Sequence, residues 1–457
     1  MIMRLISEQE ITDVLKRLDI SDISKVTIRQ SVNVAKELER LTGEPFVHLE
    51  FGVPGLDACQ VGIEAQKAAL DSGCASVYPP AAGIPELKKA GSRFVKAYTG
   101  IDVAPEGIVP TIGSMQACYN LLLECSQMSP GKDAVIYVNP GFSSHYVQAN
   151  VLGLKTRMFD VYDNRGEAFG KRLEELMSDG RVCAIVYSNP NNPSWVCLTQ
   201  DELRMLGELC TKYDVIALED MAYMCMDFRE DRSHPYLPPY QPTVAHYTDN
   251  WVMMISASKI FSYAGERIAM AVISDKLCGR EFPALRERYG LGHFGDNFAL
   301  TYVYVNTSSA AHSSQRAFAA MLDAAADGAY DFVNNVKEYA VRAHRVKEIF
   351  REHGFSLVYD KDMDKYARAA GVNIGWMGNQ AASVYQQKSY TWANLSTEYM
   401  KQGGGVRTIE EFTKAGIAIS VFNADDDATM NYYISNASSM KAICTNYPKK
   451  LIGKMRK

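Results

Sequence analysis

The chain has 457 residues, of which 47% are hydrophobic and 22% are charged, a composition typical of a globular enzyme with room for two domains. Its formal net charge of −5 argues against a nucleic-acid partner, and no apolar run approaches the length of a membrane span. The ten cysteines include no Cys-x-x-Cys pair, so we expect neither a metal site nor a disulfide framework, and we predict a reducing, cytoplasmic location.

Helical patterns come first in the chain, and strands follow later. Residues 1–16 carry charges among their apolar positions, so we expect neither a signal peptide nor an anchor there. The clearest early helix is predicted over residues 27–41. From residue 107 onward, strand and helix patterns alternate, which is typical of βαβ units in a mostly parallel sheet. Strands are predicted near residue 108 and over residues 134–138, 182–187, 215–220, 251–255 and 269–274, with a helix over residues 199–213.

The last part of the chain has a different pattern. A long helical region is predicted over residues 313–353, and short extended pieces with helical patterns between them follow it. This arrangement predicts a smaller α+β domain. The extended pieces are residues 355–359, 372–376, 417–421 and 432–435. We therefore predict an N-terminal segment over residues 1–65 that contributes to the small domain, a large domain over 66–330 and a C-terminal small domain over 331–457.

A lysine and two serines follow the predicted buried strand 251–255. They are Ser256, Ser258 and Lys259, and Arg267 comes eight residues after the lysine. The carboxyl edge of an open α/β sheet is where ligands bind, and a guanidinium suits a phosphate. A lysine that forms an imine has to be desolvated and held beside such an anion-binding shell. A solvated basic turn remains the alternative for this stretch alone.

Other chemistry-bearing residues also follow predicted strands. Asp220 could keep a pyridine nitrogen protonated, and Phe142 offers a flat face for stacking on a ring. The phenol of Tyr223 and the amide of Asn192 could donate to a ring oxygen, and Gly113 with Ser114 opens a helix start that can bind an anion. Each feature alone also occurs in α/β proteins without such a site. Their shared order along one sheet indicates a single cofactor that carries a pyridine ring and a phosphate.

The pattern Ser-x-Ser-Lys-x5-Gly-x-Arg is met by Ser256, Ser258, Lys259, Gly265 and Arg267. In this and in the features above, the chain resembles the class I/II aminotransferases, the fold-type I pyridoxal-phosphate enzymes related to aspartate aminotransferase, from Gly52 to about Ala437. The resemblance implies an α/β large domain, with a mostly parallel sheet of the seven-stranded type flanked by helices, and a smaller α+β domain. It also implies a homodimer with shared active sites.

The resemblance assigns roles to single residues. Lys259 would form a Schiff base with the cofactor and act in catalysis with Asp220 and Tyr223. The cofactor-binding residues would be Tyr78 (reaching into the neighbouring subunit), Gly113, Ser114, Met115, Phe142, Asn192, Asp220, Tyr223, Ser256, Ser258, Lys259 and Arg267. The substrate-binding residues would be Gly52, Asn192 and Tyr433. Gly52 lies in a Gly-x-Pro sequence at the end of a short extended segment, where glycine lets a backbone amide approach a ligand closely. An ordinary strand-to-turn connection would have the same sequence pattern.

Two positions depart from the family pattern. Ser194-Trp195 stands where Asn-Pro is usually followed by Thr-Gly, and Tyr433 stands where a carboxyl-terminal Arg usually binds the substrate carboxylate. Either the substrate lacks a free α-carboxylate or is bound in a changed pose, or another cation, with Arg316 and Arg407 as candidates, replaces this Arg. The other alternative is that a shift in the preceding loop misaligns this strand with the family pattern, so that Tyr433 does not stand at the position of the Arg.

We therefore predict a pyridoxal 5′-phosphate-dependent aminotransferase that acts on an amino acid or related amine and a keto acceptor. A lyase or decarboxylase on the same scaffold is the alternative, because the cofactor performs the electron chemistry in all of these reactions. A pyridoxal-phosphate-sensing transcription regulator is disfavoured, because the segment before Gly52 is short and lacks a basic pair of helices.

Overall fold

The computed structural model describes residues 8–21, 28–43, 54–139, 141–161, 164–192, 194–341, 343, 355–357 and 393–395. The chain divides into two compact units. One consists of Leu56–Pro190 and Cys197–Val336, and is called the sheet unit below; the other consists of Met1–Gly55, Asn191–Val196 and Lys337–Lys457. The domain boundaries proposed from the sequence (1–65, 66–330 and 331–457) stay a prediction.

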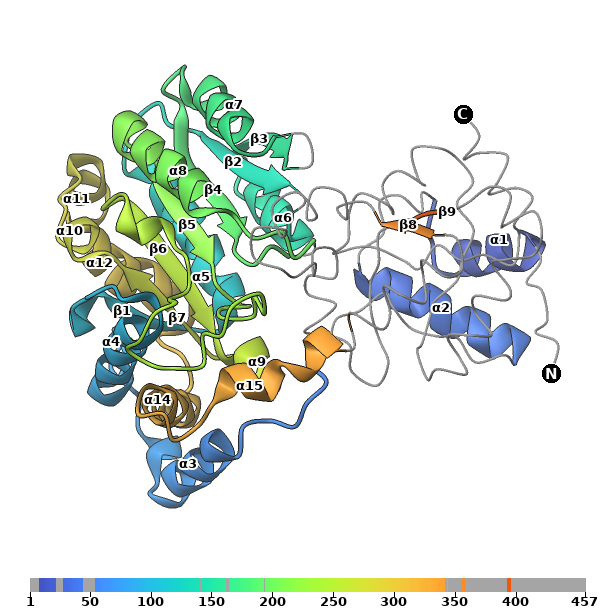
Figure 1. The fold of residues 1–457 in the computed structure, drawn as a ribbon, viewed down its shortest axis with the longest axis horizontal. Helices are drawn as coiled ribbons and strands as arrows, with labels where there is room; N and C mark the ends of the chain where they lie inside the picture. Colours follow the sequence, from blue (N-terminus) through green and yellow to red (C-terminus); the bar gives the residue numbers. More distant parts are fainter. Residues whose placement is uncertain are drawn as a thin grey trace. The chain divides into compact units, whose positions relative to one another are not determined.

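The sheet unit is built on seven strands (Figure 1). Their order is β1-β7-β6-β5-β4-β2-β3, and β7 runs antiparallel to both of its neighbours while the other pairs are parallel. All residues of β4 to β7 are buried, as expected for strands covered on both faces. The strands are β1 (Ile108–Thr111), β2 (Ala134–Asn139), β3 (Lys155–Asp160), β4 (Val182–Ser188), β5 (Ile216–Asp220), β6 (Trp251–Ser256) and β7 (Ala269–Ile273).

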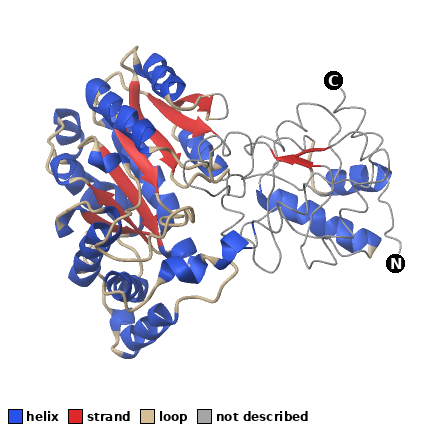
Figure 2. Cartoon of the chain, in the orientation of Figure 1, coloured by secondary structure: helices blue, strands red, loops and turns tan. Residues whose placement is uncertain are grey.

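Helices flank this sheet on both sides (Figures 1 and 2). Helix α5 (Gly113–Gln127) packs across β1 and β4 to β7, whereas α8 (Gln200–Tyr213) packs on β5 and on α7 (Glu167–Met177). The remaining α-helices are α3 (Gln60–Asp71), α4 (Pro85–Thr99), α6 (Ser143–Val151), α9 (Ala257–Ile260), α10 (Asp275–Cys278), α11 (Pro283–Tyr289), α12 (Phe294–Asn297), α13 (Tyr304–Thr307), α14 (His312–Ala326) and α15 (Phe332–Val336). The short helices are η2 (Cys74–Ser76), η3 (Pro105–Gly107), η4 (Val244–His246), η5 (Ala264–Glu266) and the π-helical η6 (Phe298–Val303). The predicted α/β fold class is confirmed.

The long helix predicted over residues 313–353 is wrong. Helix α14 ends at Ala326, and Gly328 follows with a φ of +71°. A glycine in the left-handed region just past a helix end is a common stop signal, because other residues pay a steric penalty there. A new short helix, α15, begins only at Phe332.

The second unit is described in part. Helix α1 (Glu8–Arg17) and helix α2 (Ile28–Thr42) lie in it, and α2 matches the helix predicted over residues 27–41. A two-stranded antiparallel ladder joins β8 (Phe355–Leu357) and β9 (Ala393–Leu395). The strands predicted over residues 372–376, 417–421 and 432–435 lie outside the described residues.

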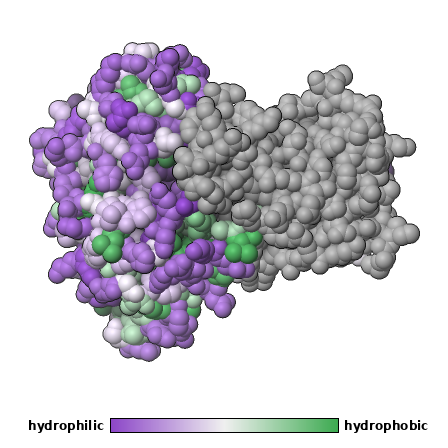
Figure 3. Space-filling model, viewed as in Figure 1, coloured by the Kyte–Doolittle hydropathy of each residue, from purple (hydrophilic) through white to green (hydrophobic). Residues whose placement is uncertain are grey.

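The surface of the sheet unit is largely hydrophilic on the face drawn in Figure 3, with small separate hydrophobic areas. The apolar side chains are instead collected between the sheet and its helices, where Leu121, Val186 and Leu218 are completely buried or nearly so. Among the helices that the structure describes, none has the length and apolarity needed to cross a membrane.

Candidate active site

Three chain segments meet at the carboxyl edge of the sheet. Asp220 ends β5, Ser256 ends β6, and Gly113 begins α5 directly after β1. These three strands point in the same direction, so their carboxyl ends share one edge. The sheet order places β7 between β1 and β6, and the chain returns along β7 after Arg267.

The hydroxyls and the guanidinium predicted to bind a phosphate lie together. The Ser256 hydroxyl accepts a hydrogen bond from the Ser258 amide at 3.1 Å and donates to the Ser258 hydroxyl at 2.9 Å. Arg267 Nη1 lies 3.5 Å from the Ser258 hydroxyl and donates to the Ala264 carbonyl at 2.9 Å. The guanidinium is thus held by backbone on one side and by a hydroxyl on the other.

Gly113 lies against this guanidinium. Its φ is +69°, and a Cβ added there would come within 2.6 Å of Arg267 Nη2. Glycine therefore leaves the start of α5 open, where the first backbone amides of a helix lack partners within the helix. Ser114 and Met115 follow in this first turn. Free helix-start amides, two hydroxyls and a guanidinium around a position without a side chain fit the phosphate of pyridoxal 5′-phosphate.

Lys259 lies in α9, one residue beyond Ser258, and is half-buried. Burial, with a smaller contribution from the positive charge of Arg267, lowers the pKa of Lys259 to about 8. An amine with a lowered pKa is neutral in a larger fraction of molecules near pH 7, which favours attack on an aldehyde.

The Asp220 carboxylate is buried and has two polar neighbours. One oxygen accepts a hydrogen bond from the Ala222 amide at 3.1 Å, and the other lies 3.6 Å from His145 Nε2. Burial raises the pKa of Asp220 to about 6, although the Ala222 hydrogen bond opposes the shift. A carboxylate in such an environment is stabilised by a cationic partner, and a protonated pyridine nitrogen would be one.

His145 has a place in this site that the sequence did not predict. Burial lowers the pKa of His145 to about 4, so its imidazole is neutral at pH 7. Its ring contacts that of Phe142 edge to face, with ring centres 5.3 Å apart. The sequence signal that could have indicated this role is the position of His145 near the start of a helix, three residues after the predicted stacking residue Phe142.

Tyr223 lies in the same buried region. Burial and the nearby Asp220 carboxylate hold the pKa of the Tyr223 phenol well above its usual value. The phenol is therefore protonated at neutral pH and can donate a hydrogen bond.

The other predicted residues are described one by one. Tyr78 belongs to the sheet unit and is 89% exposed. Asn192 is buried and is grouped with the second unit. Arg316, a candidate cation, forms an ion pair with Glu86 at 2.7 Å. Gly52, Arg407 and Tyr433 lie outside the described residues.

Ser194 and Trp195, which replace the usual Thr-Gly, form a tight turn. The Trp195 amide donates to the Asn191 carbonyl at 2.9 Å, and the Ser194 hydroxyl donates to the Asn191 side chain at 2.7 Å. Trp195 has a φ of +61° and is 1% exposed. Trp195 thus has the left-handed backbone conformation that glycine adopts most easily, and its large side chain is buried.

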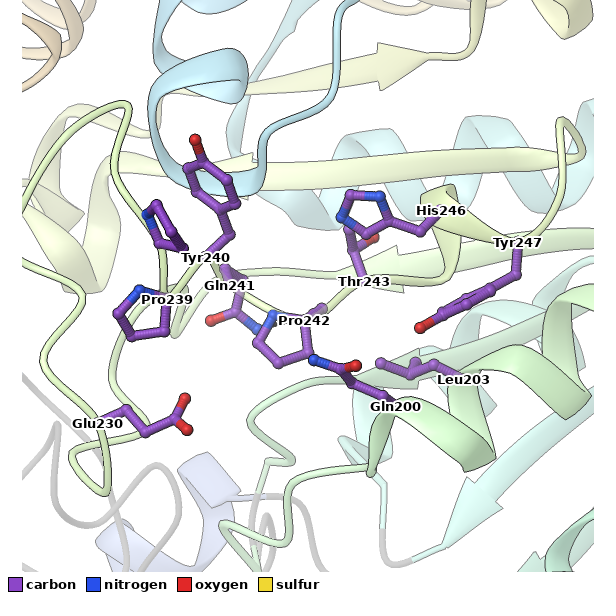
Figure 4. Close-up of a pocket in the computed structure, with 11 residues that line it drawn as sticks. Gln200, Leu203, Glu230, Pro239, Tyr240, Gln241, Pro242, Thr243, His246 and Tyr247 are labelled. Carbon is purple, nitrogen blue, oxygen red and sulfur yellow. Dashed lines mark hydrogen bonds between the residues drawn. The ribbon is translucent and has the colours of Figure 1, made fainter. Parts of the chain in front are cut away.

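A cavity of about 550 Å³ lies elsewhere in the sheet unit, beside α8 and η4 (Figure 4). None of the predicted site residues lines it. Two of its polar side chains are already bonded within the protein: the Glu230 carboxylate accepts from Arg232 at 2.6 Å, and His246 Nε2 lies 3.1 Å from the Thr99 carbonyl. We therefore assign it no part in the reaction. No cluster of metal-ligating side chains occurs within the described ranges.

Comparison with known proteins finds matches to the sequence and to the fold. A family model described as aminotransferase class I and II matches residues 44–362. The chain is 26% identical over 281 residues to a probable aspartate aminotransferase of Methanocaldococcus jannaschii, which is 62% of this chain and 71% of that protein. It is 27% identical over 252 residues to the aspartate aminotransferase of Pyrococcus horikoshii, which is 55% of this chain and 60% of that protein.

The fold also matches a solved structure. The aspartate aminotransferase of Thermus thermophilus with maleate superposes with a TM-score of 0.62 and 20% identity, covering 99% of this chain and 98% of that one. Nothing among these matches favours the lyase or decarboxylase alternative. The family match covers most of the chain, and the chain therefore belongs to the class I and II aminotransferases, the pyridoxal 5′-phosphate-dependent transaminases of fold type I.

Proposed function

We propose that this protein moves amino groups between an amino acid or related amine and a keto acceptor, with Lys259 as the residue to which the cofactor bonds. The observation that carries the proposal is the placement of Lys259, with its lowered pKa, beside the donors of Ser256, Ser258 and Arg267. A second support is the buried Asp220 carboxylate at the neighbouring strand end.

Each residue would contribute a binding or proton-transfer step. Pyridoxal 5′-phosphate, when bound, supplies the electron sink that makes a substrate C–H bond acidic. Gly113, Ser114 and Met115 would bind its phosphate through the start of α5, together with Ser256, Ser258 and Arg267. Asp220 would hold the proton on the pyridine nitrogen, Phe142 would stack on the ring, and Tyr223 and Asn192 would donate to its oxygen. Lys259 Nζ would take a proton from the substrate carbon and return it to the cofactor as general base and acid.

The test is direct. Purified protein treated with borohydride should carry the mass of the reduced cofactor on the peptide that contains Lys259, because reduction makes the bond permanent. Lys259→Ala should abolish turnover but still bind the cofactor, since the phosphate and ring contacts remain. Label on a different lysine would contradict the assignment.

We further propose that the substrate lacks a free α-carboxylate or binds in a changed pose, or that another cation, with Arg316 and Arg407 as candidates, replaces the family's Arg. The matched relatives are named for aspartate, but the resemblance to the family implies that Tyr433 stands where its carboxylate-binding Arg would be. Losing one partner of a desolvated guanidinium–carboxylate pair costs about 2–5 kcal/mol, and a single phenol hydrogen bond does not replace the charge. Arg316, which is ion-paired with Glu86, is a weak candidate for the missing cation. Half-reactions that are as fast with common L-amino acids as with amines, that are unchanged in Tyr433→Phe and that require neither Arg316 nor Arg407 would refute this proposal.

We also propose a cytoplasmic homodimer with shared active sites. Tyr78 supports the shared site, because its phenol is exposed on the surface of a single subunit and is free to reach a neighbouring one. The cytoplasmic location is supported by the cysteines that the structure describes, since no disulfide links them.

A further inference from the structure

Gln148 is a buried polar residue that joins two helices of the site. It lies in α6, is 8% exposed, and its side-chain amide nitrogen donates to the Met115 carbonyl at 2.7 Å. The side-chain oxygen is buried and accepts no hydrogen bond from the residues that the structure describes. Burying an amide with one unsatisfied atom destabilises a protein relative to an apolar side chain of similar size. Within the described part of the chain, the hydrogen bond to Met115 is therefore the one interaction that glutamine makes at this position and that an apolar side chain of the same size could not make.

The accepting carbonyl belongs to the first turn of α5. This turn carries Gly113 and Ser114, the helix start beside the Arg267 guanidinium. The Gln148 contact thus fixes this turn in space relative to α6.

Helix α6 also contacts the other end of the site. Phe142, His145 and Gln148 recur at three-residue intervals, so they follow one side of the helix. His145 approaches Asp220 at 3.6 Å, and the Tyr137 hydroxyl secures the His145 carbonyl at 2.9 Å. One rigid helix of nine residues therefore contacts both the buried carboxylate and the anion-binding turn.

We infer that Gln148 is a positioning residue that holds the phosphate-binding turn of α5 at a fixed distance from Asp220 and Phe142. The inference rests on the proposed function, because it takes these two places as the ends of the pyridoxal 5′-phosphate site. A displacement of about 1 Å in such a constellation is enough to weaken binding and catalysis substantially.

The test compares two cofactor forms in one variant. Gln148→Met keeps the length of the side chain and removes the donor. One lost hydrogen bond corresponds to a roughly two- to tenfold change in a dissociation constant. We expect the dissociation constant of the apoprotein for pyridoxal 5′-phosphate to rise by this factor, while that for pyridoxal, which has no phosphate, stays the same. A general loss of packing would weaken both.

Gln127→Met is the matched control. It makes the same replacement on α5 but at the far end, where Gln127 accepts hydrogen bonds from Tyr302 at 3.1 Å and from Tyr289. The ratio of its dissociation constants for pyridoxal 5′-phosphate and for pyridoxal should equal that of the wild type. Gln148→Leu, which also removes the donor, replaces Gln148→Met if that variant does not fold.

Two outcomes would overturn the inference: an unchanged affinity ratio in the Gln148 variant, or an equal change of the ratio in Gln127→Met. Failure of the proposed function would look different. In that case the wild-type protein itself would not bind pyridoxal 5′-phosphate more tightly than pyridoxal.

Discussion

Burial shifts the ionisable groups of the site toward their neutral forms. It lowers the pKa of Lys259 to about 8 and of His145 to about 4, and it raises the pKa of Asp220 to about 6. The directions differ because burial disfavours whichever form is charged. Without the cofactor, the buried Asp220 carboxylate therefore reduces the stability of the protein once it ionises. A cationic partner would remove that disadvantage.

Asp220→Asn tests this at the level of one residue. A carboxyl group with a raised pKa contributes stability at low pH, and this contribution is lost as the pH rises through about 6. Relative to the wild type, the apo variant should become more stable between pH 4 and pH 8, by up to about 3 kcal/mol, because a pKa unit is worth about 1.4 kcal/mol. Denaturant unfolding at several pH values measures the difference. A difference that does not change with pH would contradict the raised pKa.

Gly113→Ala separates backbone strain from phosphate binding. The added Cβ would meet the end of the flexible Arg267 side chain, so the guanidinium should move rather than the backbone. The left-handed φ should cost about 1 kcal/mol of stability. The affinity for pyridoxal 5′-phosphate should fall roughly ten- to a hundredfold, since a charge-assisted hydrogen bond is misplaced.

Gly180→Ala is the control for that experiment. Gly180 has a φ of +72° and no atom within 4 Å of the added Cβ. It should lose similar stability, measured by denaturant unfolding, and no cofactor affinity. Equal losses of affinity in the two variants would show that strain, not the displaced guanidinium, is responsible.

Among the helices, α8 shows how a local sequence signal and a tertiary contact combine. The sequence predicted a helix from Thr199, and Thr199 caps α8 through a reciprocal pair of hydrogen bonds with Glu202. The same carboxylate also forms a buried ion pair with Arg165 at 2.8 Å and accepts from the Gly166 amide at 2.7 Å. The capping role was readable from spacing, whereas the Arg165 contact depends on a residue 37 positions away.

Two substitutions should separate these contributions. Thr199→Ala should cost about 1 kcal/mol of unfolding free energy, the usual value of a lost helix cap. Glu202→Gln should cost more, about 3–5 kcal/mol, because it removes the negative charge from a buried ion pair with Arg165. Thr211→Ala, in the same helix, removes only a contact with Thr248 on the surface and should change stability by less than about 0.5 kcal/mol. Equal losses for Glu202→Gln and Thr199→Ala would show that the ion pair adds nothing.

For the molecule as a whole, the sequence predicted what depends on local pattern. The buried strands around Ile185, Leu218 and Met254 were found because continuous apolar runs mark strands covered on both faces. Strand β3 was missed, because it lies at the sheet edge and Phe159 is its one buried residue. The proximity of His145 to Asp220 was missed because it arises only when two distant segments pack together.

The dimer proposal is tested by mixing subunits. Lys259→Ala and Tyr78→Phe proteins, each inactive or impaired, should recover activity on subunit exchange. Random pairing gives half heterodimers with one intact site each, so about a quarter of the wild-type activity is expected. A mixture of Lys259→Ala with the Lys259→Ala/Tyr78→Phe double variant is the control and should stay inactive. An active monomer on a sizing column would refute sharing.

The position of β7 in the sheet has a consequence for how the protein is made. In the described sheet, β1 pairs with β7 alone, and Ile108 faces Val272, which the ribosome adds about 160 residues later. At roughly 5–20 residues per second, β1 waits on the order of ten to thirty seconds for its partner. During that interval its apolar strand is open to neighbouring nascent chains. The proposed phosphate site is also incomplete until then, because it joins the start of α5, which follows β1, to Ser256, Ser258 and Arg267, which precede β7. Binding of pyridoxal 5′-phosphate to chains during synthesis would therefore indicate when β7 has paired with β1.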